Sequence, residues 1–262
     1  MSAFDPGLPP AGSDDHQFAA WAATKAGELL TEVRATGLEG RELKDAGDLA
    51  SHELLMGLLA EYRPDDAVLS EEEHRGTASR HDRHTASRVW IIDPLDGTRE
   101  FSEPPRDDWA VHVALWQDGD LVAGAVAQPG LGTTFRTGVP QPLAPSDATR
   151  PRLVVSRTRP PAFMEGLTAE LGAELVPMGS AGAKAMSVIR GVSDAYVHAG
   201  GQYEWDSAAP VVVARNAGLF TSRIDGSPLV YNRADPTLPD LIICRPELSG
   251  PILAYLAANP PS

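Results

Sequence analysis

A short stretch in the middle of the chain combines the residue types that bind a metal ion. Val89–Ile92 is apolar and β-like, which predicts a buried strand, and Pro94 is expected to end it because proline has no N–H to donate. Asp93 and Asp96 lie three residues apart across the predicted turn, so their carboxylates can converge with the Leu95 carbonyl. Oxygen clusters of this kind suit hard cations such as Mg²⁺. A surface turn is the alternative, since Asp, Pro and Gly are common turn residues.

The residues that follow can contact an anion beside that cation. Gly97 lets a backbone N–H come close, and Thr98 adds a hydroxyl at the same place. The strand predicted over Ala67–Ser70 repeats the arrangement, because it ends in the acidic triplet Glu71–Glu73. An acidic triplet alone is typical of a solvated surface. Both interpretations of the triplet therefore stay open, a second set of ligands or a solvated face.

Two other acidic residues stand at predicted helix starts. Asp48 begins a helix predicted to run to Tyr62, and Asp206 begins one predicted to run to Asn216. A carboxylate at a helix start is favourable as an N-cap, so capping alone accounts for either residue. Chemistry at these two positions therefore needs support from elsewhere in the chain.

A small-residue helix start in the second half suggests a phosphate contact. Gly179–Gly182 opens a predicted helix and can offer backbone N–H groups to a phosphate, with Ser180 among them. Such a start is common, so the signal is weak by itself. Lys184 strengthens it, because the same helix then carries a point charge.

Composition and charge limit the possible functions. The chain has 262 residues, of which 42% are hydrophobic and 22% charged, values that are ordinary for a globular protein with a substantial core. Its net charge is −14. Duplex nucleic acids and anionic membranes need clustered cations, so neither is an expected partner. An anionic small molecule would need local cations.

The single cysteine and the apolar segments indicate the compartment. Cys244 follows the apolar run Leu241–Ile243, which predicts a buried thiol and allows no internal disulfide. A reducing cytoplasm fits this usage. No signal-peptide pattern opens the chain and no apolar run approaches membrane-spanning length, so we expect neither secretion nor a membrane span.

Hydrophobic periodicity predicts a layered α/β protein. Residues 1–12 are rich in Pro and Gly and predict a flexible arm, and four prolines within 138–151 mark a boundary. The boundary separates an N-terminal α+β region, 13–150, from a C-terminal α/β region, 151–262, and we expect both to form one catalytic unit. The predicted elements are helices over 14–37 and 48–62, strands over 67–70, 89–92, 110–116, 121–128 and 133–137, then strands at 153–155, 174–176 and 195–197 alternating with helices near 161, over 183–190 and over 205–216.

One segment is basic in this acidic chain. Residues 74–88 contain four arginines and three histidines against one acid, Asp82. The histidines lack the close spacing of a metal site. The segment is interpreted first as a solvated loop and second as a cationic flap over the site.

Taken together, the acidic clusters resemble the signature of a phosphatase family. Asp48, Glu71–Glu72, Asp93–Thr98 and Trp205–Ala209 occur in the order found in the magnesium-dependent, lithium-sensitive phosphatases that include inositol monophosphatase. Within that family the chain is most similar to the CysQ-type 3′(2′),5′-bisphosphate nucleotidases of actinobacteria. The segments that carry this similarity are Val68–Glu72, Gly97–Phe101, Val155–Arg157 and most of Gly179–Ala209.

The resemblance implies a fold, a metal centre and an activity. It implies the layered αβαβα sandwich shared with fructose-1,6-bisphosphatase, and two or three Mg²⁺ ions held by Glu71, Asp93, the Leu95 carbonyl, Asp96 and Asp206. Thr98 and Asp48 would orient and deprotonate the attacking water. The substrate-binding candidates are Gly97, Thr98, Arg157, Ser180, Lys184 and Tyr203.

The implied substrate is a nucleotide with two phosphates. The enzyme would remove the 3′-phosphate of adenosine 3′,5′-bisphosphate, with its sulfated form PAPS as a further substrate, in sulfate assimilation. Two positions depart from relatives. Lys44–Gly47 replaces the usual threonine and alanines, which leaves Asp45 as a competitor for the role of Asp48. His198 stands where inositol-specific relatives have an acid, which weakens an inositol interpretation.

Other functions stay open at this stage. Broad-specificity inositol-1-monophosphatase or fructose-1,6-bisphosphatase activity is one alternative, and a regulatory binding protein with a residual phosphatase site is another. The complete set of acids argues against a degenerate site. The expected partner is a phosphate ester; a homodimer is left open, and neither a nucleic-acid polymer nor a membrane is expected.

Overall fold

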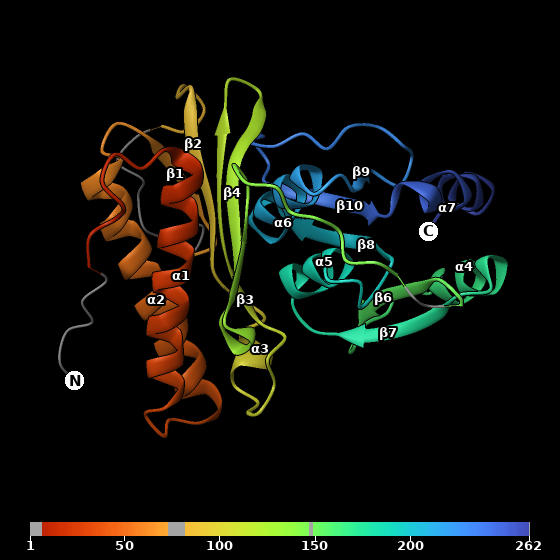
Figure 1. Ribbon diagram of the computed structural model, residues 1–262, viewed down its shortest axis with the longest axis horizontal. Coiled ribbons are helices and arrows are strands. Elements are labelled where there is room, and N and C mark those ends of the chain that lie inside the picture. The colour runs from red at the N-terminus through yellow and green to blue at the C-terminus, as the bar shows by residue number, and fades with distance from the viewer. Residues whose placement is uncertain (1–6, 73–81, 147–148, 262) are drawn as a thin grey trace.

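The elements of the protein stack in five layers of helices and sheets. The structure is a computed structural model that describes residues 7–72, 82–146 and 149–261. Two five-stranded sheets alternate with three layers of helices, so the order is helix, sheet, helix, sheet, helix (Figure 1). This arrangement confirms the αβαβα sandwich expected from the sequence.

The first sheet carries the central motif. Its strand order is β1-β2-β3-β4-β5, with β1 parallel to β2 and the other pairs antiparallel. Asp118 and Gly119 turn the predicted hairpin with positive φ angles of 49° and 106°. A 3₁₀ turn, η2 (Pro129–Leu131), precedes the last strand. The strands are β1 (Ala67–Ser70), β2 (Arg88–Asp96), β3 (Ala110–Gln117), β4 (Asp120–Gln128) and β5 (Thr133–Arg136).

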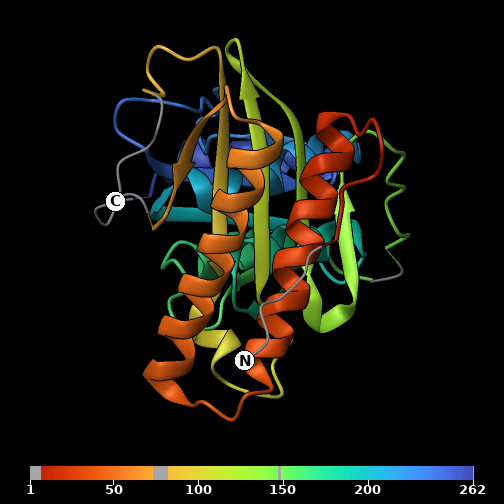
Figure 2. The same cartoon turned by 90° about the vertical axis from the view of Figure 1, so that its left-hand side faces the viewer.

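Two long helices cover the outer face of this sheet. Figure 2 shows α1 (Asp15–Arg34) and α2 (Gly40–Tyr62) side by side in front of the strands. The predicted capping box is confirmed, since Gln17 N donates to Asp14 Oδ1 at 2.8 Å and Asp14 N donates to Gln17 Oε1 at 3.1 Å.

Helix α2 begins earlier than the sequence predicted. Its first residue is Gly40, so Asp48 lies in the body of the helix and the prediction that Asp48 begins it is wrong. The extra turns carry Leu43, which is buried and joins the apolar core under the helix. A Cβ at Gly47 would lie 2.6 Å from the Phe101 ring, so this glycine lets the helix approach the central motif.

The second sheet has the strand order β7-β6-β8-β10-β9. Its first strands and helices follow the predicted alternation, although β8 runs six residues past the predicted end at 197. The last strands and the final helix, α7, were not predicted. The strands are β6 (Arg152–Ser156), β7 (Glu174–Met178), β8 (Ala195–Tyr203), β9 (Phe220–Ser222) and β10 (Thr237–Cys244).

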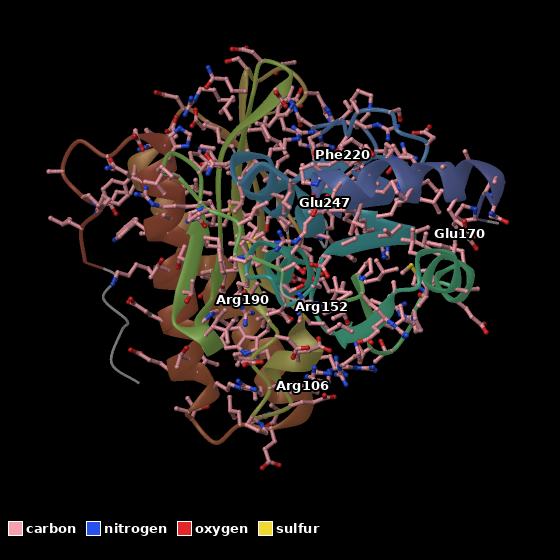
Figure 3. The ribbon with its side chains drawn as sticks, turned by 45° about the vertical axis from the view of Figure 1, so that its right-hand side comes forward. Arg106, Arg152, Glu170, Arg190, Phe220 and Glu247 are labelled. Atoms are coloured by element: carbon pink, nitrogen blue, oxygen red, sulfur yellow. The ribbon has the colours of Figure 1, made fainter. Side chains whose placement is uncertain are left out.

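Helices α5 (Ala181–Ile189) and α6 (Glu204–Asn216) lie between the two sheets. Helices α4 (Met164–Leu171) and α7 (Pro246–Ala258) cover the outer face of the second sheet. The labelled Glu170, on α4, lies at the edge of the molecule far from α1 and α2 (Figure 3). Within the described ranges, no helix combines the length and apolar character needed to cross a membrane.

Candidate active site

Three carboxylates from the two halves of the chain, two of them buried and one partly buried, meet between the sheets. Asp93 and Asp96 come from the end of β2, and Asp206 comes from the first turn of α6. One carboxylate oxygen of each lies within 4.8 Å of the others. Asp93 is 1% exposed and Asp96 8% exposed. The central motif and the Asp206 segment, predicted separately, therefore form one acidic cluster.

A bulge at the end of β2 places the first two acids. The register with β3 shifts between Asp93 and Asp96, and β2 continues through Pro94, so the prediction that proline ends the strand is wrong. Strand β1 stops beside Ile92, so no neighbour on that side needs the missing proline N–H. The Pro94 carbonyl instead accepts a bond from the buried Ser51 hydroxyl on α2 at 2.6 Å.

Asp48 and Thr98 lie together beside the bulge. The Thr98 hydroxyl is 3.4 Å from Asp48 Oδ1 and 3.2 Å from the Leu95 carbonyl oxygen. Asp45, the competing residue, is 68% exposed and pairs with Arg41 on the outer surface of α2. The structure thus places Asp48, and not Asp45, beside Thr98.

Ionising all of the carboxyl groups in this cluster without a cation would be energetically unfavourable, and the pKa values of Asp93 and Asp206 are raised for this reason. Burial raises the pKa of Asp93, and the charges of Glu71, Asp96 and Asp206 raise it further. Burial likewise raises the pKa of Asp206, to about 6. Glu71 directly follows β1, and its charge is close enough to raise the pKa of Asp93. Its carboxylate is not among the three that converge. A divalent cation would relieve this repulsion.

Asp96 is held by the N-terminal end of α5. Its carboxylate accepts hydrogen bonds from Gly182 N at 2.6 Å, from Ala181 N at 3.0 Å and from the Ser180 hydroxyl. Gly179 N donates to Asp108 at 2.6 Å. The sequence predicted these N–H groups for a substrate phosphate. Asp96 and Asp108 occupy them instead, because the positive helix end attracts the nearest buried carboxylates.

His112 is a part of the site that sequence reasoning missed. It lies in β3 with 0% exposure, and its Nε2 is 3.1 Å from Asp96 Oδ2. Burial disfavours its charged form, but the neighbouring Asp96 charge outweighs burial and raises the pKa of His112. The surrounding strand is apolar, so its pattern predicted only a core position. The available signal was a histidine in an apolar strand, which needs a polar partner once it is buried.

Lys184 lies beneath the cluster on α5. Its ammonium donates to the Ser180 carbonyl at 2.7 Å and the Gly179 carbonyl at 3.2 Å, and it lies 5.2 Å from the centre of the Tyr196 ring. Burial lowers the pKa of Lys184, while nearby carboxylates, Asp96 first among them, raise it. The predicted point charge is therefore next to the acids.

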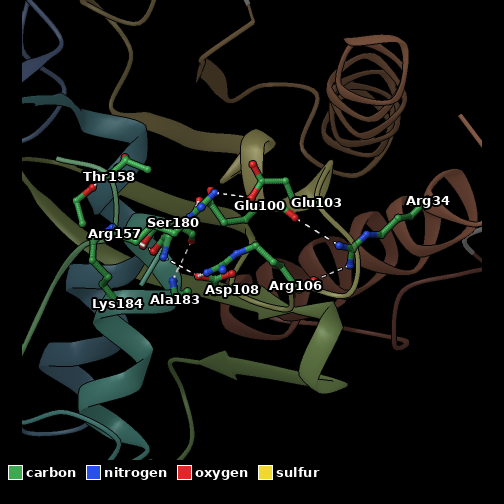
Figure 4. Close-up of polar contacts among 12 residues, drawn as sticks. Arg34, Glu100, Glu103, Arg106, Asp108, Arg157, Thr158, Ser180, Ala183 and Lys184 are labelled. Atoms are coloured by element: carbon green, nitrogen blue, oxygen red, sulfur yellow. Dashed lines mark hydrogen bonds and ion pairs between the residues drawn. The ribbon is translucent and has the colours of Figure 1, made fainter. Parts of the chain in front are cut away.

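A pocket of about 860 Å³ joins the acidic cluster to a group of cations. Arg157, a predicted phosphate ligand, lines it but pairs with Glu100 at 2.6 Å and Glu103 at 2.7 Å (Figure 4). Arg99 and Arg159 line the same pocket and form no ion pair within the described part of the chain. The other lining residues include Asp96, Gly97, Ser180, Lys184, Tyr196, His198, Tyr203 and Asp206.

The basic segment contributes less than expected where it is described. Arg88 pairs with Asp66 and Asp15 at the other end of β2, at 2.8 and 3.0 Å. Arg83 donates to the carbonyl oxygens of Arg233 and Ala234. Neither arginine is among the residues that line the pocket. Residues 74–81 lie outside the described residues.

One wall of the pocket is aromatic, because Tyr203 lines it and the buried Trp205 lies behind Tyr203. Tyr203 stacks on Trp205 with ring centres 4.5 Å apart and planes 8° apart. Tyr203 is 40% exposed, and its backbone N–H donates to Asp206 Oδ2 at 2.7 Å. The candidate base contact is thereby tied directly to the acidic cluster.

The geometry and the sequence place the chain in a known class of metal-dependent phosphatases. A model of the inositol monophosphatase family matches residues 14–256, and the chain belongs to that family. The family is metal-dependent. A set of carboxylates with a backbone carbonyl beside it has the chemistry that such a centre requires.

Individual relatives within the family point to a narrower group of phosphatases. The chain is 50% identical, over 242 residues that cover 88% of it and 89% of the relative, to a 3′-phosphoadenosine 5′-phosphate phosphatase of Mycobacterium bovis. It is 31% identical, over 71% of its length and 78% of the relative, to the 3′(2′),5′-bisphosphate nucleotidase CysQ of Escherichia coli. A crystal structure of CysQ from Bacteroides thetaiotaomicron superimposes with a TM-score of 0.72 at 27% identity, over 88% of this chain and 97% of that one.

Proposed function

We propose that this protein is a Mg²⁺-dependent phosphatase that removes the 3′-phosphate of adenosine 3′,5′-bisphosphate in the cytoplasm. The observation that carries the proposal is a pocket that joins the acidic cluster to several cations. A metal centre needs the acidic cluster, and the second phosphate of the substrate needs the cations. The names of the relatives at 50% and 31% identity, both enzymes of 3′-phosphorylated nucleotides, support the same substrate.

The proposed metal ligands are Asp93, Asp96, Asp206, Glu71 and the Leu95 carbonyl. Bound Mg²⁺ would neutralise charge on the transferring phosphate and lower the pKa of the attacking water. Hard oxygen ligands suit Mg²⁺ better than softer metals. The same ions account for how an anionic ester enters a chain of net charge −14.

The chain's own residues would orient the reactants. Asp48 would accept the proton of the Thr98 hydroxyl as that hydroxyl takes a proton from the attacking water. The Gly97 and Thr98 N–H groups contact the transferring phosphate. Gly97 has a φ of 85°, and a Cβ there would lie 3.0 Å from Ser180, so a larger residue would be strained and would press on the neighbouring helix start.

The cationic end of the pocket would bind the 5′-phosphate. Lys184 is fixed and buried, whereas Arg159 is exposed and can reach a bound anion. Arg157 would join them by exchanging Glu100 for phosphate. Charge-assisted hydrogen bonds of this kind are about twice as strong as neutral ones. An ester without a second phosphate would leave these cations unused.

The aromatic wall would take the adenine. Tyr203 offers a flat surface whose orientation is set by Trp205 behind it and by Asp206 through its N–H. Bases stack on such rings with gains of about 1–3 kcal/mol. Inositol phosphates lack this group.

The test is phosphate release from three esters at saturating Mg²⁺. We expect kcat/KM for adenosine 3′,5′-bisphosphate to exceed that for inositol 1-phosphate by about 10-fold or more, with fructose 1,6-bisphosphate also below it. Chelator should abolish activity and Li⁺ should reduce it. Equal or better hydrolysis of inositol 1-phosphate would replace the proposed substrate. Absence of Mg²⁺-dependent release from all three, with a stable protein partner in a pull-down, would favour a regulatory binding protein.

A further inference from the structure

The buried imidazole of His112 touches both chain segments that supply the acidic cluster. His112 pairs with Asp93 in the β2–β3 register, so it lies beside the bulge. One side of its ring faces Asp96, at the end of β2. The other side faces Trp205, the residue that directly precedes Asp206 in α6.

The two ring nitrogens make different contacts. Nδ1 lies 3.0 Å from the Trp205 carbonyl oxygen, and because a carbonyl can only accept, Nδ1 carries a proton and donates. Nε2 lies 3.1 Å from Asp96 Oδ2, within ion-pair distance although it is not aligned as a hydrogen bond. One ring therefore spans from a carboxylate on the first sheet to the backbone of the helix that carries Asp206.

The start of α5 leaves space for this ring. A Cβ on Gly182 would lie 2.1 Å from His112 Nε2 and 3.1 Å from Ala110, so only glycine fits there without movement. The Gly182 N–H at the same time binds Asp96 Oδ2 at 2.6 Å. The His112 ring and the start of α5 thus both contact Asp96 Oδ2. Within the described residues, Asp96 Oδ1 accepts one hydrogen bond, from Ala181 N.

We propose that His112 is a positioning residue of the metal centre, which sets the separation of Asp96 from Asp206 so that ligands from the two halves of the chain face the same ion. The proposal rests on the Mg²⁺ site of the proposed function. Carboxylates within 4.8 Å of one another repel, and they move apart unless something holds them. Outer partners of metal ligands act in this way, by fixing the orientation before the ion arrives.

Three substitutions separate the contacts of the ring. His112→Asn places an amide nitrogen near the position of Nδ1, so it keeps the bond to Trp205 and loses the contact with Asp96. His112→Gln returns a donor beside Asp96. His112→Leu removes both contacts with little change in volume. His16→Asn is the matched control, because His16 is bonded to Thr137 between α1 and the end of β5, outside the pocket.

The readout is Mg²⁺ binding by titration calorimetry without substrate, so it does not depend on which ester is hydrolysed. We expect the Mg²⁺ Kd to rise by about 10-fold or more for His112→Asn and further for His112→Leu. His112→Gln should lie closer to wild type than His112→Asn, and His16→Asn should match wild type. Near-UV circular dichroism checks that each variant is folded.

A merely structural role predicts a different result. It would lower the Tm of the His112 variants equally with and without Mg²⁺ and leave Kd unchanged in the folded protein. A Kd within twofold of wild type for folded His112→Asn and His112→Leu, or for the two amide variants if the leucine variant does not fold, would overturn the proposal. A wild-type protein that binds no Mg²⁺ would overturn it together with the proposed cofactor.

Discussion

The two ends of the pocket are built in opposite ways. At the acidic end the side chains are short, buried and bonded to the backbone of a neighbouring element, as Asp96 is to the start of α5. At the cationic end the arginine side chains are long and more exposed than the buried Lys184, and Arg157 is engaged with Glu100 and Glu103 (Figure 4). Arg99 and Arg159 are exposed there.

This difference assigns different tasks to the two ends. Groups that stabilise a transition state must be in place before the reaction, because moving them during the reaction costs free energy. Long cationic side chains lose rotamer freedom when they bind, so they can select a substrate but position it less exactly. We therefore expect damage at the acidic end to lower kcat and damage at the cationic end to raise KM.

The largest effect is expected at the acidic end. Asp96→Asn removes a charge from the metal cluster, so kcat should fall by at least about 100-fold while the fold persists. Turnover at saturating Mg²⁺ and substrate measures it, with circular dichroism as the check on folding. A folded Asp96→Asn protein with near wild-type turnover would remove Asp96 from the metal centre.

A second effect at the same end separates two neighbouring acids. Asp48→Asn should lower kcat by about 100-fold with little change in KM, because Asp48 contacts the Thr98 hydroxyl. Asp45→Asn is the matched control and should be close to neutral, since Asp45 is exposed on the outer side of α2. Steady-state kinetics of the Asp48→Asn and Asp45→Asn variants measure this difference. The reverse ranking would contradict the placement of Asp48.

The three converging acids could be predicted from the sequence because Asp93 and Asp96 follow an apolar run and Asp206 stands at a helix start. Strand ends and helix starts are visible in hydrophobic periodicity, and carboxylates there are chemically conspicuous. The layered fold followed from the same alternation. The position of Asp48 in its helix could not be predicted, because Gly47 suggests an interruption, and the close approach to Phe101 that requires a glycine there is a tertiary contact.

The cationic end could not be predicted to the same degree. Which arginine is paired depends on residues far away in sequence, and Glu100 is 57 positions from Arg157. Arg159 gave no signal because an exposed arginine beside prolines is ordinary. His112 and the bonds from α5 to Asp96 join different elements, and local patterns carry no information on such contacts.

A smaller effect is expected at the aromatic wall. Tyr203→Ala should raise KM for adenosine 3′,5′-bisphosphate by about 10-fold and leave kcat little changed, since stacking on a base contributes about 1–3 kcal/mol. Tyr203→Phe keeps the ring and should resemble wild type. A small phosphate ester without a base serves as the substrate control. If Tyr203→Ala weakened both substrates equally, the base would bind elsewhere.

The smallest effect concerns pH. Burial, followed by the Asp96 charge, raises the pKa of Asp206 to about 6, so in the metal-free protein this carboxyl is more protonated at pH 5.5 than at pH 7.5. Its contribution to stability therefore falls as pH rises through that range without metal, whereas Mg²⁺ binds the ionised form. We expect the Tm increase caused by Mg²⁺ to be larger at pH 7.5 than at pH 5.5. Equal increases at both values would show that Asp206 does not titrate with binding.

The most direct test of the division between the two ends uses two nucleotides that differ in one group. Adenosine 3′,5′-bisphosphate and adenosine 3′-monophosphate share the scissile phosphate and the base, and only the first has a 5′-phosphate. Wild-type kcat/KM should favour the bisphosphate by about 10-fold or more, and Arg159→Ala should remove most of that preference while hydrolysing the monophosphate normally. Arg41→Ala, at a site 91% exposed on α2, should keep the preference. A wild-type enzyme that treats the two nucleotides alike would contradict the account.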